Sequence, residues 1–177
     1  MKQSFDLDKA IRKVPDFPKE GILFYDITGI LQDIEAFRYC IDTMKEKYGS
    51  KNIDAVAAIE ARGFLFAAPF ALEMGIPLIL IRKKGKLPRK TISASYALEY
   101  GEAEIEMHAE DVKSGQNVLV TDDLFATGGT VKAACTLIEK AGGRVQEIFG
   151  IVGLPFLEYE KVLEGYTVET LINYDSE

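Results

Sequence analysis

Two adjacent carboxylates and the glycine-rich loop that follows them have the clearest chemical potential in this sequence. Asp122 and Asp123 follow an apolar stretch at 117–121, and the loop at 126–130 leads into a periodically apolar segment at 131–141. Small residues let backbone N–H groups approach an anion closely, and the positive end of a helix dipole stabilises it. This order of strand, loop and helix predicts a phosphate site, with hydroxyl donors from two threonines of the loop.

The acidic pair indicates what else the ligand contains. Asp122 and Asp123, which we expect at an exposed strand end, cannot bind a phosphate and suit the hydroxyl groups beside it, as in a sugar 5-phosphate or a metal-chelated diol. The alternative is a solvated strand end before a plain turn, but the complete string favours a ligand site. Neither GxxxxGK[ST] nor GxGxxG occurs in the chain, which disfavours a Walker loop and a dinucleotide fold.

An alternation of strands and helices must position these residues. Continuous apolar runs are typical of strands buried on both faces of a parallel sheet, and the alternation places helices on both faces. We therefore expect an α/β fold with a central, mainly parallel sheet flanked by helices. The expected strands are 53–59, 77–82, 117–121, 145–152 and, at an edge, 167–172, and the expected helices are 6–13, 33–49, 64–74 and 131–141.

The helix expected between Asp33 and Gly49 has the clearest local signals. Asp33 is a suitable N-cap, and Gly49 a suitable end. Cys40 lies beside the apolar face and is expected to be a small core residue. The residues expected to form that buried face are Ile34, Phe37, Ile41, Met44 and Tyr48.

Two further segments stand out. The alternation over 94–100 and 103–108, around Gly101, predicts a β-hairpin inserted on the sheet. A cluster of six cations precedes it, in a chain whose net charge is −7, so it is a local exception to the charge balance. These cations are Arg82, Lys83, Lys84, Lys86, Arg89 and Lys90.

Composition limits the function classes. The chain has 177 residues, with 21 Lys and Arg against 28 Asp and Glu, which fits one domain over 1–177 and disfavours nucleic-acid binding. Two cysteines are too few for a disulfide framework, and the first residues form no secretion signal, so we expect a cytoplasmic protein. The apolar run at 63–81 contains Pro69, Gly75 and Pro77, which predicts a helix and a strand, not a membrane span. With one histidine, His108, the chain has no His-based metal site or Ser-His-Asp triad.

The chain resembles the adenine phosphoribosyltransferases, a type I purine/pyrimidine phosphoribosyltransferase family that uses 5-phosphoribosyl-1-diphosphate. The matching segments are PDFPKEGILFYDITG at 15–29, EARGFLFA at 60–67, RKKGKLP at 82–88 with SYALEYG at 95–101, and VLVTDDLFATGGT at 118–130. They follow the family's order and spacing. The resemblance implies conversion of adenine and 5-phosphoribosyl-1-diphosphate to AMP and diphosphate in purine salvage. It also implies Mg²⁺ that is held by substrate oxygens and waters, with no direct protein ligand.

The resemblance also implies roles for individual residues. Arg62 supplies the bidentate charge that a diphosphate requires, with Arg82 a further candidate beside it. The implied 5-phosphate residues are Ala126, Thr127, Gly128, Gly129 and Thr130, and the implied ribose residues are Asp122 and Asp123. The implied diphosphate residues are Glu60, Ala61, Arg62, Gly63, Lys83 and Lys86.

The base and the acid–base group come from two other segments. Phe24 is implied to stack on one face of the purine, with Leu124 on the other face. Leu23 and Tyr25 are implied to offer backbone groups to the edge of the purine. The alternative for Phe24 is an aromatic residue of the core. Many relatives have Arg at position 25 and Leu at position 125, where this chain has Tyr25 and Phe125. Ser95 and Tyr96 match a hood over the substrate, and Glu99 matches the family's candidate catalytic acid.

The resemblance divides the single domain into a base-binding segment at 1–32, a flexible loop and hairpin at 83–108, and the sheet. Two other functions are weighed: a transferase for hypoxanthine, guanine or xanthine, which the N-terminal segment disfavours, and a DNA-binding regulator, which the acidic charge disfavours. A homodimer is implied and has independent support. The helix 63–74 is apolar nearly all round, so either a partner subunit or the segment 154–172 must cover its second side.

Overall fold

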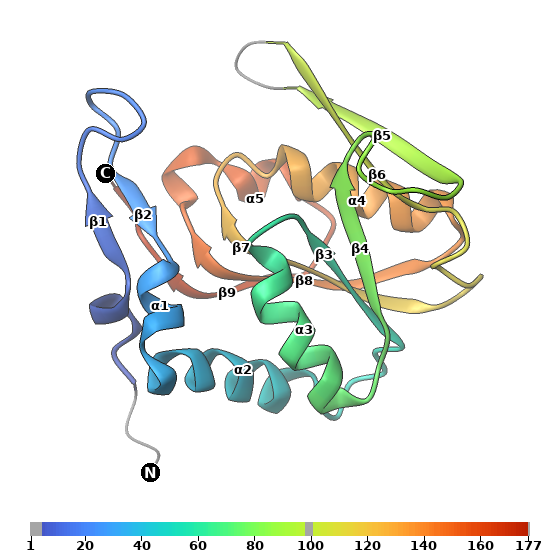
Figure 1. Ribbon diagram of the computed structural model, residues 1–177, viewed down its shortest axis with the longest axis horizontal. Helices are drawn as coiled ribbons and strands as arrows, with labels where there is room; N and C mark the ends of the chain where they lie inside the picture. Colours follow the sequence, from blue (N-terminus) through green and yellow to red (C-terminus); the bar gives the residue numbers. More distant parts are fainter. Residues whose placement is uncertain (1–4, 98–100, 177) are drawn as a thin grey trace.

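A seven-stranded sheet forms the centre of the computed structural model, which describes residues 5–97 and 101–176 (Figure 1). The strand order is β5-β6-β4-β3-β7-β8-β9. The five strands from β4 to β9 in this order run parallel, and the β5–β6 hairpin joins β4 antiparallel. The strands are β3 (Ala55–Ile59), β4 (Leu78–Lys83), β5 (Thr91–Ala97), β6 (Glu102–His108), β7 (Asn117–Phe125), β8 (Arg144–Gly153) and β9 (Val168–Asn173).

Helices cover both faces of the sheet, as expected. Alternate residues of β3 enter two separate cores: Val56 packs with α2 (Ile34–Tyr48) and α3 (Gly63–Met74), whereas Ala57 packs with α4 (Gly129–Lys140). All of β3 is buried, which explains its unbroken apolar sequence. The short elements η2 (Pro155–Leu157) and α5 (Tyr159–Val162) connect β8 to β9.

Helix α2 begins and ends where its sequence predicts. The Asp33 carboxylate accepts hydrogen bonds from the backbone N–H groups of Glu35 (3.0 Å) and Ala36 (3.2 Å). Cys40 is fully buried, as expected of a core residue. Ile34 is 63% exposed, so its assignment to the buried face is wrong: as the first residue of the helix it lies outside the packed turns.

The N-terminal segment departs from the expected helix at 6–13. Only Leu7–Ala10 forms a 3-10 helix (η1), and Arg12–Val14 forms a strand, β1, that pairs with β2 (Phe24–Asp26) in a separate two-stranded sheet. The residue before a proline disfavours the helical region, and Val14 precedes Pro15, so pairing with β2 prevails. A short helix, α1 (Thr28–Gln32), follows.

The long apolar run at 63–81 divides into α3 and β4. Gly75 ends the helix in the left-handed conformation at φ +67°, which glycine adopts without steric cost. Among residues 5–97 and 101–176, no helix combines the length and the apolar character needed to cross a bilayer.

Candidate functional site

The acidic pair lies inside strand β7, not at an exposed strand end. The strand was expected to stop at Thr121, but its pairing with β8 continues as far as Phe125 and Gly153, whereas its pairing with β3 ends at Thr121. Asp122 is half-buried and Asp123 is only 5% exposed. The two carboxylates therefore occupy the edge where β3 has ended and β8 still supports β7, which is where ligands bind in such sheets.

Burial makes both carboxylates hard to ionise together. It raises the pKa of Asp122 well above the ordinary value, and the neighbouring charge of Asp123 raises it further. Burial also raises the pKa of Asp123, while the Arg62 guanidinium opposes that rise. The Asp123 backbone N–H donates to the Asp122 carboxylate (2.9 Å). A perturbed acidic pair at the sheet edge is typical of a functional site.

The loop after β3 contacts the acidic pair directly. Arg62 Nε lies 2.9 Å from Asp123 Oδ2. A Cβ added at Gly63 would lie 2.9 Å from Asp122 Oδ1, so this position requires glycine for the loop to approach β7. The Arg62 guanidinium also lies 5.7 Å from the centre of the Phe24 ring. The structure thus brings together residues assigned to diphosphate, ribose and base.

Glu60, at the start of the same loop, supports the basic stretch. Its carboxylate accepts hydrogen bonds from Arg82 Nε (2.9 Å) and the Lys83 backbone N–H (2.5 Å), and Arg82 in turn donates to the Lys86 carbonyl (3.0 Å). Burial opposes ionisation of Glu60, but these donors outweigh it and hold its pKa below the ordinary value. The Arg82 guanidinium is thus occupied by contacts within the protein, whereas the Lys83 and Lys86 side chains are exposed.

Glu106 holds the same loop from the other side, and it is not among the residues that the sequence singles out. Its side chain is buried and accepts from the backbone N–H groups of Lys86 and Leu87 (both 3.0 Å) and from the Thr91 hydroxyl (3.0 Å). Burial opposes its ionisation, but these hydrogen bonds prevail and lower its pKa. The alternation of β6 places Glu106 on the polar face with Glu104, so the sequence carried no signal for its burial.

The glycine-rich loop forms a small pocket of about 90 Å³ at the start of α4. Gly128 has φ +81°, and a Cβ there would lie 3.1 Å from the Tyr159 carbonyl oxygen. No side chain caps the helix, so its first N–H groups are free to face an anion. The pocket is lined by Asp122, Leu124, Phe125, Ala126, Thr127, Gly128, Thr130 and Val131.

The hairpin packs beside this loop. Tyr96 and Gly129 approach closely, with 3.6 Å between the ring and a Cβ placed on the glycine, and a groove of about 410 Å³ lies between β5 and α4. Ser95, also on β5, lines the same groove. Glu99, expected to be catalytic, lies outside the described residues.

The residues expected to bind the base are Leu23, which precedes β2, Phe24 and Tyr25 on β2, and Leu124 on β7. Phe24 is half-buried and packs edge-on against Phe17, with 5.0 Å between ring centroids, so it is not a core aromatic. Leu23 and Leu124 are also half-buried. Tyr25 is only 3% exposed, and its side chain packs away from Phe24.

Phe125 belongs to the protein interior. It is 1% exposed and packs against Tyr159, with 5.6 Å between ring centroids. A Cβ at Gly150 would lie 2.7 Å from the Phe125 ring, so glycine on β8 makes room for a side chain larger than leucine.

Among the described residues, other polar groups show no arrangement for metal binding. The His108 ring is nearly buried, with Nδ1 3.4 Å from an Asp111 carboxylate oxygen. Within the part of the chain that the structure describes, no cluster of three or more His, Cys, Asp or Glu side chains could hold a metal ion.

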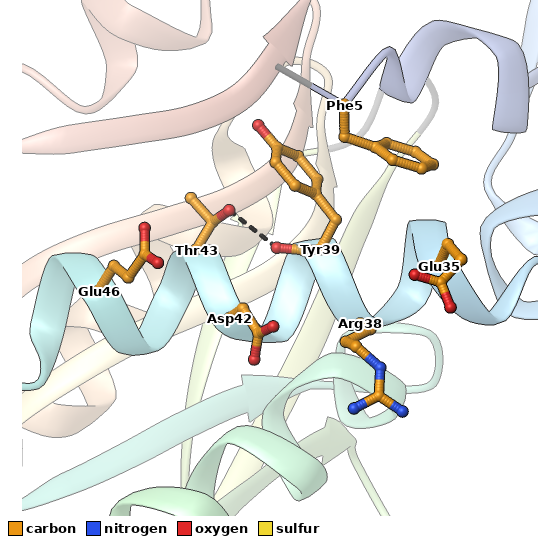
Figure 2. Close-up of a pocket in the computed structure, with 7 residues that line it drawn as sticks. All are labelled: Phe5, Glu35, Arg38, Tyr39, Asp42, Thr43 and Glu46. Carbon is orange, nitrogen blue, oxygen red and sulfur yellow. Dashed lines mark hydrogen bonds between the residues drawn. The ribbon is translucent and has the colours of Figure 1, made fainter. Parts of the chain in front are cut away.

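A separate pocket of about 280 Å³ lies on the outer face of α2, away from the strand ends (Figure 2). Phe5 and Tyr39 stack beside it, with 5.3 Å between ring centroids. Its other lining residues are Glu35, Arg38, Asp42, Thr43 and Glu46. None of these residues contributes to the edge of the sheet that carries the acidic pair.

Comparison with known proteins agrees with this geometry. Residues 27–153 match the family model of the phosphoribosyl transferase domain. The chain is 66% identical over 171 residues to an adenine phosphoribosyltransferase of Treponema denticola, covering 97% of this chain and 90% of that protein.

Solved structures are similar over nearly the whole chain. Adenine phosphoribosyltransferase of Thermoanaerobacter pseudethanolicus has a TM-score of 0.92 and 45% identity, covering 95% of this chain and 98% of that one. The Saccharomyces cerevisiae enzyme, solved with an imino-altritol bisphosphate and adenine, has a TM-score of 0.88 and 36% identity, covering 93% and 96%.

Proposed function

This chain belongs to the phosphoribosyltransferase family, and from that premise we propose that it transfers the phosphoribosyl group of 5-phosphoribosyl-1-diphosphate to adenine. The products are AMP and diphosphate, and the reaction serves purine salvage. One observation carries the proposal: Arg62 lies 2.9 Å from Asp123 and 5.7 Å from the Phe24 ring centre, so the groups for diphosphate, ribose and base converge.

In this reaction a C–N bond forms at ribose C1 while the C–O bond to diphosphate breaks, and the base loses one proton. The loop 126–130 holds the 5-phosphate with its backbone N–H groups and hydroxyls. Asp122 and Asp123 accept hydrogen bonds from the ribose 2- and 3-hydroxyls. Holding the sugar at both ends keeps C1 in line with the base and the leaving group, and this positioning supplies much of the rate.

The loop 60–63 and the basic stretch bind the diphosphate leaving group. Arg62 binds the diphosphate through paired N–H groups, and Lys83 and Lys86 add charge. Glu60, which the resemblance assigns to the diphosphate loop, acts through its hydrogen bonds to the basic stretch, as does Glu106. Their hydrogen bonds to Arg82, Lys83 and Lys86 hold the stretch beside the site, which supports its assignment to the diphosphate.

The base lies between Phe24 and Leu124. Backbone groups of Leu23 and Tyr25 distinguish a 6-amino from a 6-oxo purine, since donor and acceptor exchange places between the two. The Tyr25 side chain is only 3% exposed, so this role falls to the backbone and does not require the arginine side chain that relatives have at this position.

The hood and the proton acceptor come from the hairpin. Ser95 and Tyr96 border the phosphate loop and cover the substrate. Glu99 takes the proton from the purine, or stabilises the charge on it, as the C–N bond forms.

Magnesium accompanies the diphosphate. The nearby donors, Asp122 and Asp123, are carboxylates, and oxygen ligands suit this cation. When bound, Mg²⁺ neutralises charge on the leaving diphosphate. Substrate oxygens and waters hold it, and the two aspartates act on the ribose hydroxyls.

The enzyme acts as a homodimer. Leu65 is 42% exposed and Leu72 is 83% exposed, so the segment 154–172 does not cover this face of α3. Large exposed apolar side chains in a row mark an interface, and a two-fold partner is the commonest occupant.

The enzyme acts in the cytoplasm. Cys40 and Cys135 are buried and form no disulfide, which fits a reducing compartment.

The deciding experiment is turnover with 5-phosphoribosyl-1-diphosphate and Mg²⁺, comparing adenine with guanine and hypoxanthine. We expect AMP and diphosphate from adenine and rates at least about 100-fold lower from the 6-oxo purines, because their edge groups leave buried partners unpaired. Equal use of hypoxanthine or guanine would refute the base assignment.

A further inference from the structure

Tyr25 connects the base-binding strand to the C-terminal end of the chain. Its ring stacks on Tyr174, with 4.1 Å between centroids and 22° between planes. Its hydroxyl donates to the Ser176 carbonyl (3.1 Å). Phe24, the preceding residue of β2, projects to the opposite side, because successive side chains of a strand alternate, and contacts Arg62.

Tyr174 is itself held by two parts of the molecule. Its backbone N–H donates to the carbonyl of Gly153, the last residue of β8 (3.0 Å). Its hydroxyl donates to the Asp8 carboxylate. The Lys13 ammonium lies 4.9 Å from the Tyr174 ring centre and 2.9 Å from an Asp8 oxygen. Through its backbone Tyr174 belongs to the large sheet, and through its side chain it belongs to the N-terminal segment.

Strand β2 needs such a connection. It has three residues, pairs only with β1 in the described part of the chain, and shares no backbone ladder with the seven-stranded sheet. An isolated two-stranded sheet is marginally stable, so side-chain contacts must fix its position.

We propose that Tyr174 is a positioning residue for the purine: it fixes Tyr25, and thereby sets where Phe24 and the backbone groups of β2 meet the base. The inference rests on the proposed function, since it assigns β2 to adenine. It predicts that the C-terminal tyrosine controls the affinity for adenine and leaves the affinity for 5-phosphoribosyl-1-diphosphate unchanged, because the ion pair of Arg62 with Asp123 holds the loop at 60–63 on β7 and the loop at 126–130 continues from that strand.

The test compares Tyr174→Leu and Tyr174→Phe, with Tyr166→Leu as a matched control. Phenylalanine keeps the stack on Tyr25, and leucine removes it while retaining apolar bulk. Tyr166 also has a lysine over its ring, Lys132 at 4.5 Å, and donates to a carboxylate, Glu139, at 2.9 Å, but it packs in the other core. KM for each substrate and kcat are measured for all variants, together with Tm.

We expect Tyr174→Leu to raise the KM for adenine about three- to tenfold, which is the usual worth of an aromatic pair. The KM for 5-phosphoribosyl-1-diphosphate should stay within about twofold of wild type. Tyr174→Phe should restore most of the adenine KM, and Tyr166→Leu should leave it unchanged.

An unchanged adenine KM in Tyr174→Leu, or an equal rise of both KM values, would overturn the inference. If that variant fails to fold, Tyr25→Leu removes the same stack from the other side and is judged by the same criteria. If wild type itself does not turn over adenine, the proposed function fails, an outcome distinct from an unchanged KM in an active enzyme.

Discussion

The Arg62 guanidinium lies 2.9 Å from the Asp123 carboxylate, which ties the loop proposed to bind diphosphate to the strand proposed to bind ribose. Gly63 allows this contact, since any side chain there would meet Asp122. Two segments about 60 residues apart in the sequence therefore depend on each other for their positions.

Asp122→Asn combined with Asp123→Asn should reduce kcat/KM by about 10²-fold or more, because hydrogen bonds from the ribose hydroxyls lose their charged acceptors. The folded fraction should remain near wild type, since asparagine has the size of aspartate. Circular dichroism and steady-state kinetics measure both quantities. Near-normal kcat/KM in a folded double variant would remove the ribose assignment.

Asp122→Asn alone should raise Tm by a few degrees at pH 8 while lowering activity. Because burial and the Asp123 charge raise the pKa of Asp122 above its ordinary 3.8, the folded protein binds this proton more tightly than the unfolded chain. Its contribution to stability is fully present below pH 3.8 and is lost as the pH rises through the folded-state pKa.

Neutral asparagine avoids that loss, so the Tm difference from wild type should narrow as the pH falls from 8 toward 5. A melting series over this range measures it, with Asp54→Asn, an exposed aspartate, as the control. A Tm difference between Asp122→Asn and wild type that stays constant with pH would contradict the explanation from the raised pKa of Asp122.

Gly128→Ala should raise the KM for 5-phosphoribosyl-1-diphosphate and lower Tm. At φ +81° a side chain costs about 1–2 kcal/mol, and its Cβ would crowd Tyr159. Gly165→Ala is the matched control, because it puts a side chain at a similar φ of +94° outside the loop, where its Cβ would meet nothing within 4 Å. Equal effects of the two alanines on KM and Tm would count against the loop geometry.

Glu106→Gln should raise the KM for 5-phosphoribosyl-1-diphosphate several-fold and leave that for adenine near wild type. The neutral amide weakens the hydrogen bonds from Lys86 and Leu87, and the basic stretch loses its support. Glu102→Gln, at an exposed position of the same strand, is the control. A wild-type KM in Glu106→Gln would show that Glu60 alone suffices to hold the stretch.

Leu72→Glu should convert a dimer to a monomer. Wild type should sediment with a mass near twice 19.6 kDa, and the variant near 19.6 kDa, since a carboxylate would be buried without a partner at the interface. Leu157→Glu, at a 37% exposed leucine outside α3, is the control. A fully active wild-type monomer at micromolar concentration would end the dimer proposal.

The local sequence determined most of the elements and the identity of the phosphate loop. Asp33 capped α2 and Gly75 ended α3 because these signals act over a few residues and require no distant partner. The apolar run of β3 also predicted burial on both faces. Successive residues of a strand point to opposite faces, and in this run all but Asp54 of the residues 53–59 are apolar.

Tertiary structure decided what depends on pairing between distant segments. Asp123 is buried because pairing with β8 continues strand β7 beyond Thr121. No local sequence pattern indicates where that pairing ends. Residues 12–14 form a strand because β2 pairs with them. Glu106 supports the basic stretch because β4 pairs with β6, and Tyr174 contacts Tyr25 because the N-terminal segment packs against the end of the chain. A sequence specifies which side chains are available, but burial and hydrogen bonding depend on which distant strands become neighbours.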